Sequence, residues 1–143
     1  MLEQDVVTVL GGRRTLGRAV HSQLDLADLI LKGMPRRAAE ALRRRMHSSE
    51  QEFAQSLGIS AKTLQRSVSK PRLTPAQGDR LYRLARIVAM AEDVLEDEEQ
   101  AYRWLREPHR GLGGRVALDL ISTEAGAREV EDLLGRIEHG VFS

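Results

Sequence analysis

The polar side chains between residues 60 and 72 have the chemistry that binding to a nucleic acid requires. Lysine and arginine neutralise phosphates, and glutamine and arginine also make paired hydrogen bonds to base edges in a major groove. We expect these side chains to point outward from a helix that enters such a groove. The candidate DNA-binding residues are Ser60, Lys62, Thr63, Gln65, Arg66, Lys70 and Arg72.

The segment of residues 50–69 predicts the two helices and the turn that would position these side chains. Ala54 is small where two helices cross closely, and Gly58 permits the positive φ of a tight turn. Ser60 is placed to cap the second helix, and the residues that would hold this helix against the first are Ile59, Leu64 and Val68. The pattern indicates a helix-turn-helix at about residues 49–69. A helical hairpin that binds no DNA is the alternative.

The other polar residues form no recognisable catalytic or metal site. The carboxylates of residues 92–99 form one solvated acidic run, and four histidines lie on separate predicted elements without metal-ligand spacing: His21, His47, His109 and His139. The absence of cysteine excludes disulfides and thiolate metal sites and suits a reducing compartment. The acidic first residues do not resemble a signal peptide. We therefore expect a cytoplasmic protein with no enzymatic activity, no cofactor and no membrane segment.

The net charge of +1 conceals an uneven distribution of charge along the chain. Residues 32–90 contain 13 lysines and arginines against four aspartates and glutamates, whereas residues 91–143 contain six against 13. A basic middle indicates a polyanionic partner, and an acidic end indicates a second surface with a different task. Solvated helix faces would give the same distribution and are the alternative.

The hydrophobic pattern predicts an all-α fold. Hydrophobic residues make up 41% of the sequence and aromatic residues only 3%, which favours helix packing over an aromatic β-sandwich. Capping boxes at residues 49–52 and 74–77 mark two helix starts, and the second opens a long helix with an apolar stripe of Leu81, Leu84, Ala85, Val88 and Ala91.

Further signals predict the remaining elements. Helices are expected over residues 24–32 with Gly33 as a cap, from Pro35 in a first turn to about Met46, over 98–106, and from about Thr123. Residues 108–114 read as a loop by composition, and residues 6–10 fit either a short strand or a buried helical turn.

Two stretches, which together cover about residues 49–143, resemble the Xre/MbcA/ParS antitoxins. The first is the helix-turn-helix and the segment 73–85 that follows it. The second is more specific and carries, in order, Trp104, Pro108, Gly113-Gly114, Thr123 with Gly126, and Gly135-Arg136-Ile137 with Gly140. The sequence departs from the family pattern at Ala117, where a proline is usual, at His109 in place of asparagine, and at Gln77-Gly78 in place of Glu-Ser.

The resemblance implies a type II antitoxin with a helix-turn-helix region, residues 1–90, packed against a small helical toxin-binding region, residues 91–143. The usual partner is a RES-domain toxin that degrades NAD or transfers its ADP-ribose. The antitoxin would cover the active site of this toxin and autorepress the shared operon by binding operator DNA. Because one helix-turn-helix binds weakly, we expect a homodimer within the complex. A transcription regulator whose C-terminal region only dimerises is the alternative.

The last residues provide a hypothesis for toxin binding. We expect Phe142, which follows an amphipathic helix and precedes only Ser143 in this sequence, to be an exposed apolar anchor beside a free carboxylate. We expect this end to enter or cap the cleft of the toxin, through Arg136, Glu138, His139, Val141, Phe142 and Ser143. The alternative is that the apolar tail folds back onto its own core. Trp104 is interpreted as a core anchor rather than a partner contact.

Overall fold

Ten α-helices and one short antiparallel hairpin form residues 2–68 and 70–140, the parts of the chain that the computed structural model describes. The helices are α1 (Leu2–Val9), α2 (Gly12–Leu16), α3 (Gln23–Lys32), α4 (Arg36–Arg45), α5 (Glu50–Leu57), α6 (Ala61–Val68), α7 (Pro75–Leu95), α8 (Glu98–Arg106), α9 (Ala117–Leu120) and α10 (Glu124–Glu138). The hairpin pairs β1 (Pro108–His109) with β2 (Arg115–Val116) through a 3-10 turn, Arg110–Leu112. The prediction of a helical fold is confirmed.

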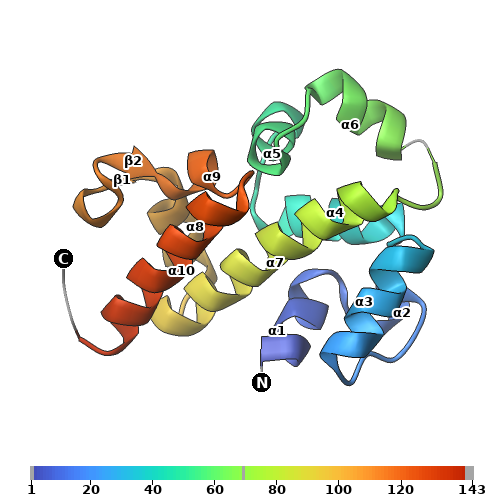
Figure 1. Ribbon diagram of the computed structural model, residues 1–143, viewed down its shortest axis with the longest axis horizontal. Coiled ribbons are helices and arrows are strands. Elements are labelled where there is room, and N and C mark those ends of the chain that lie inside the picture. The colour runs from blue at the N-terminus through green and yellow to red at the C-terminus, as the bar shows by residue number, and fades with distance from the viewer. Residues whose placement is uncertain (1, 69, 141–143) are drawn as a thin grey trace.

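Helix α7 is the central element, and it crosses the middle of the molecule in Figure 1. The Thr74 hydroxyl accepts from the Gln77 amide at 3.2 Å, and the Gln77 side chain accepts from the Thr74 amide at 2.9 Å, so the predicted capping box is formed. The predicted stripe from Leu81 to Ala91 is buried. Helices α1, α3, α5, α8 and α10 all pack on α7, and their apolar faces form one continuous core.

The N-terminal run at residues 6–10 is helical. It forms the end of α1 and the turn after it, where the Leu10 amide donates to the Val6 carbonyl at 3.1 Å. Four of its side chains are buried against the rest of the core: Val6, Val7, Val9 and Leu10. Within the described residues, no helix is long and apolar enough to cross a lipid bilayer.

Three local predictions need correction. Residues 108–114 are not wholly loop, because Pro108 and His109 pair with β2; Gly113 and Gly114 take positive φ values of 65° and 80° that let the chain reverse. Pro35 precedes the first turn of α4 as its cap residue, with an extended ψ of 140°. The Ser49 capping box is half made: the Ser49 hydroxyl accepts from the Glu52 amide, but the Glu52 carboxylate pairs with Arg106 at 3.1 Å instead.

Candidate DNA-binding and partner-binding surfaces

The turn between α5 and α6 depends on Gly58. Its φ of 75° lies in the left-handed region, and its amide donates to the carbonyls of Ala54 and Gln55. A Cβ at this position would lie 2.9 Å from the Cβ of Ser122. Both the backbone conformation and the close approach of the C-terminal region therefore require glycine here.

The inner face of α6 is anchored as the sequence predicts. The Ser60 hydroxyl accepts from the Thr63 amide at 3.1 Å and caps the helix. Leu64 is buried, Ala54 is buried on the facing α5, and Ile59 packs partly buried against the same core. The predicted contact of Val68 involves a side chain outside the described part of the chain. The result is a helix-turn-helix with α6 as the outer helix.

The outer face of α6 presents the predicted polar side chains to solvent. Lys62, Thr63, Gln65 and Arg66 are all exposed. The Gln65 amide donates to the Glu50 carboxylate at 3.3 Å, and the Thr63 hydroxyl accepts from Ser60 at 2.9 Å. Because these hydrogen bonds are exposed to solvent, replacing them with hydrogen bonds to a ligand costs little free energy. This face has the hydrogen-bonding groups for phosphate and base-edge contacts.

The two cations after α6 differ in their surroundings. Lys70 is exposed. The Arg72 guanidinium donates from Nη1 to the Gly33 carbonyl at 2.9 Å, and its backbone forms a β-bridge with Pro35. Arg72 therefore ties the segment after α6 to the start of α4. The sequence gives no signal for this contact, because its partners are 39 residues apart.

The expected toxin-binding residues lie at the end of α10. The inner face of this helix is buried through Ala127, Val130, Leu133 and Leu134. Beyond that face Arg136 is half-buried, and Glu138 and the cap residue His139 are exposed. Val141, Phe142 and Ser143 lie outside the described residues. Figure 1 shows α6 and the end of α10 at opposite ends of the molecule.

Trp104 packs within its own region. Its ring stacks on His109 with centroids 4.2 Å apart and planes at 25°, and the His109 Nε2 lies 2.6 Å from the Trp104 carbonyl oxygen. The side chain of Trp104 is half-buried and packs against the core. This supports the interpretation of Trp104 as a core anchor and gives His109 a role in holding the hairpin.

Polar contacts join α5 to the C-terminal region. Arg106 donates to the Glu52 carboxylate at 3.1 Å and to the Met46 carbonyl, and the Gln55 amide donates to Asp119 at 3.2 Å. The hydrogen bond from Arg106 lowers the pKa of the Glu52 carboxyl below its ordinary value. The first helix of the helix-turn-helix is therefore held directly by α8 and α9.

Two domains of known families match the chain. Residues 25–86 match the antitoxin Xre-like helix-turn-helix domain, and residues 90–140 match the antitoxin Xre/MbcA/ParS C-terminal toxin-binding domain. Within the described ranges, no cluster of histidine and acidic side chains could hold a metal ion.

Three curated relatives are similar to the chain over most of its length. Antitoxin Xre of Photorhabdus laumondii is 30% identical over 132 residues, which cover 91% of this chain and 89% of the relative. Antitoxin Xre of Yersinia enterocolitica is 40% identical over 94 residues, 64% of each chain. A Prs ADP-ribosylating antitoxin of Sphingobium is 27% identical over 135 residues, 85% of this chain and 83% of the relative.

Proposed function

Because the chain belongs to the antitoxin Xre family, with a helix-turn-helix and a toxin-binding domain, we propose that it neutralises a RES-domain toxin and autorepresses the operon that encodes both. One observation carries the proposal. A single chain has an exposed polar face on α6 and, at its far end, a region that matches toxin-binding domains.

The toxin in this proposal consumes NAD. The name of the Sphingobium relative joins an antitoxin to ADP-ribosylation, a reaction in which NAD supplies the ADP-ribose. We assign masking of the toxin's active site to Arg136, Glu138 and His139, and, on the sequence alone, to Val141, Phe142 and Ser143, which lie outside the described residues. The chain itself acts by binding and not by catalysis. If the neighbouring gene encodes no toxin, the protein is instead a transcription regulator whose C-terminal region only dimerises.

Operator binding is assigned to the exposed face of α6. Ser60 caps the helix; Lys62, Thr63, Gln65, Arg66 and Lys70 would contact phosphates and bases, with Arg72 positioning the segment that follows. One such face reads a short half-site, so a homodimer would bind two half-sites about one helical turn apart, or a multiple of that.

The division at residue 90 remains a prediction about function. Helix α7 runs through this position without interruption and contributes to the core beneath both regions. We infer that residues 1–90 bind DNA and residues 91–143 bind the toxin, although the two regions fold together.

Two variants of the full chain test the proposal. Arg136→Ala/Glu138→Ala/His139→Ala changes the proposed toxin surface, and Lys62→Ala/Gln65→Ala/Arg66→Ala changes the proposed DNA surface. Each is co-expressed with the product of the neighbouring gene while growth, cellular NAD and repression of the upstream region are measured. We expect the first variant to lose rescue of growth and NAD while still binding DNA, and the second to lose repression while still rescuing growth.

Each part of the proposal, toxin binding and operator binding, has a result that would contradict it. Full rescue by the α10 variant would remove these three residues from the toxin interface. If the product of the neighbouring gene forms no complex with the chain and is not toxic, the protein is a DNA-binding regulator and not an antitoxin. Unchanged repression with the α6 variant would place operator binding elsewhere.

A further inference from the structure

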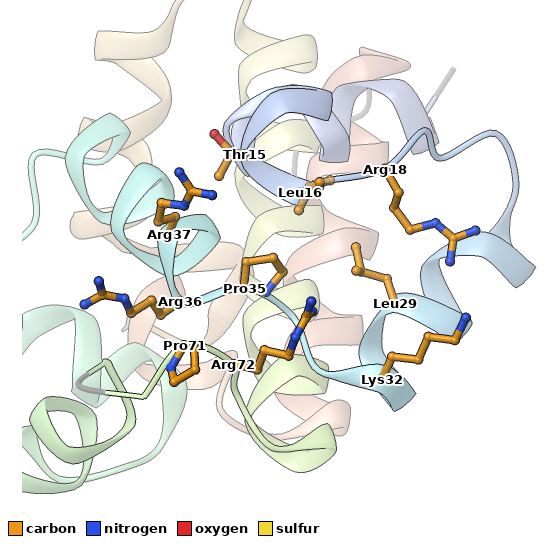
Figure 2. A pocket seen from close by; sticks show the side chains of 11 residues that line it. Thr15, Leu16, Arg18, Leu29, Lys32, Pro35, Arg36, Arg37, Pro71 and Arg72 are labelled. Atoms are coloured by element: carbon orange, nitrogen blue, oxygen red, sulfur yellow. The ribbon is translucent and has the colours of Figure 1, made fainter.

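A basic groove lies beside the helix-turn-helix and outside it. It is a cavity of about 690 Å³ between α2, α3, the start of α4 and the segment that joins α6 to α7. Figure 2 shows Arg36 and Arg37 on one side of Pro35, and Arg18 and Lys32 on the other. The basic groove is defined by Arg18, Lys32, Arg36, Arg37 and Arg72 on an apolar floor of Leu16, Leu29 and Pro35.

The charge of the basic groove is uniform. Five of its lining residues are cationic, and none of those that the structure describes there is acidic. Lys32, Arg36 and Arg37 are exposed. Arg18 forms an ion pair with Asp25 at 3.5 Å, and Arg72 donates a hydrogen bond to the Gly33 carbonyl. Cations gathered over low-dielectric walls concentrate a positive potential, which attracts anions.

Two backbone hydrogen bonds join the segment before α7 to the start of α4 within the basic groove. The Arg36 amide donates to the Pro71 carbonyl at 3.1 Å, and the Leu73 amide donates to the Met34 carbonyl at 2.8 Å. Pro71 and Arg72, which follow α6, thereby form one wall of the groove. The positive end of the α4 dipole opens beside the same wall and adds to the potential. This wall is therefore formed by the residues that follow the candidate DNA-binding helix in the chain.

We propose that the basic groove binds the sugar-phosphate backbone of the operator next to the segment that α6 reads, and so extends the DNA contact onto α3 and α4. This inference rests on the proposed operator binding. In this role the cations of the basic groove contact phosphates, which carry no sequence information. It strengthens binding to any duplex and positions α6, while α6 selects the sequence.

The test is the salt dependence of DNA binding by the full chain. The variant Lys32→Gln/Arg37→Gln removes two exposed cations from the basic groove. The control Arg110→Gln/Arg115→Gln removes two exposed cations from the hairpin, which Figure 1 shows far from α6. Dissociation constants are measured from 50 to 200 mM salt on the duplex upstream of the gene and on a scrambled duplex.

We expect the groove variant to lower the salt slope by about 2, because each phosphate contact contributes about 0.9. Between 50 and 200 mM salt its affinity would fall about tenfold less than that of the wild type. The loss should be equal on both duplexes, and the hairpin control should keep the wild-type slope. A groove variant with the slope of the hairpin control overturns the inference.

Two further readouts separate the possible failures. A wild-type chain that binds neither duplex contradicts the proposed operator function itself. If the wild type binds and Gln65→Ala relaxes its sequence preference while the groove variant changes nothing, the helix-turn-helix stands and the groove inference fails. Saturable binding of pyrophosphate to the wild type, lost in the groove variant with no change in salt slope, would assign the groove to a small phosphate ligand instead.

Discussion

Gly58 shows how one residue serves both the turn and the packing around it. Its positive φ was expected from the sequence, because only glycine enters the left-handed region without strain. The nearby Ser122 was not expected, since it belongs to the turn before α10. The same residue therefore shapes the helix-turn-helix and admits the C-terminal region against it.

We predict that Gly58→Ala lowers the free energy of unfolding by about 2–3 kcal/mol, of which the left-handed backbone accounts for about 1–2 and the approach to Ser122 for the remainder. Gly113→Ala is the matched control: its φ is 65°, but nothing lies within 4 Å of the added Cβ. Urea denaturation of the two variants measures the difference. Ser122→Gly should recover part of the loss in the Gly58→Ala background only; equal losses in Gly58→Ala and Gly113→Ala would contradict the packing argument.

Residues whose partners are close in sequence were predictable, and residues whose partners are distant were not. Thr74 with Gln77 and Ser60 with Thr63 follow from the three-residue spacing of helix caps. Arg106 bonds to Glu52, a partner 54 residues away, and the sequence has no periodic signal for that pair. For the same reason Ser49 and Glu52 look like a complete capping box, although a distant arginine takes the carboxylate.

At the scale of elements, α5 connects the two functional regions. It packs on α6, α7 and α9, and the Glu52–Arg106 pair adds a polar contact to α8. The hairpin of the C-terminal region was hard to predict because pairing between two-residue strands leaves almost no pattern in a sequence. The long helices α7 and α10 were predictable, since each buries an apolar stripe at helical spacing.

The Glu52–Arg106 pair makes stability depend on pH. Arg106 lowers the pKa of Glu52 from its ordinary value of 4.5, so the pair stabilises the fold above that pH and its contribution is lost as the pH falls through the lower folded value. We predict that wild type loses more unfolding free energy between pH 7 and pH 3 than Glu52→Gln does. The difference should be below about 1 kcal/mol, because both side chains are partly exposed.

Urea midpoints at the two pH values measure this difference. Glu129→Gln, on the exposed side of α10, makes the same change of charge away from α5 and should lose as much as the wild type. Identical losses for Glu52→Gln and wild type would show that the ion pair does not link α5 to α8 in solution.

At the scale of the whole molecule, one core supports two separated surfaces. Helix α7 lies beneath the helix-turn-helix through α5 and beneath the C-terminal region through α8 and α10. Because α6 and the end of α10 lie at opposite ends (Figure 1), the proposed DNA-binding and toxin-binding surfaces do not overlap. The proposed function would allow an operator and a toxin to be held at the same time, and a two-fold pairing of chains would have to leave the outer face of α6 and the end of α10 exposed.

Helix α3 offers an apolar face for such pairing, formed by residues that do not line the basic groove. Leu24 and Leu31 are 77% and 70% exposed and lie two helical turns apart on one face. We predict that Leu24→Ser/Leu31→Ser weakens self-association at least about tenfold, since each lost apolar contact costs about 1 kcal/mol or more. Sedimentation equilibrium measures it, with Ala76→Ser/Ala125→Ser as the control on other exposed helix faces. Because the leucines are exposed, the fold should retain its unfolding midpoint. If the variant dimerises with the affinity of the wild type, α3 does not form the dimer interface. If the wild type is monomeric, the chain does not form the expected homodimer.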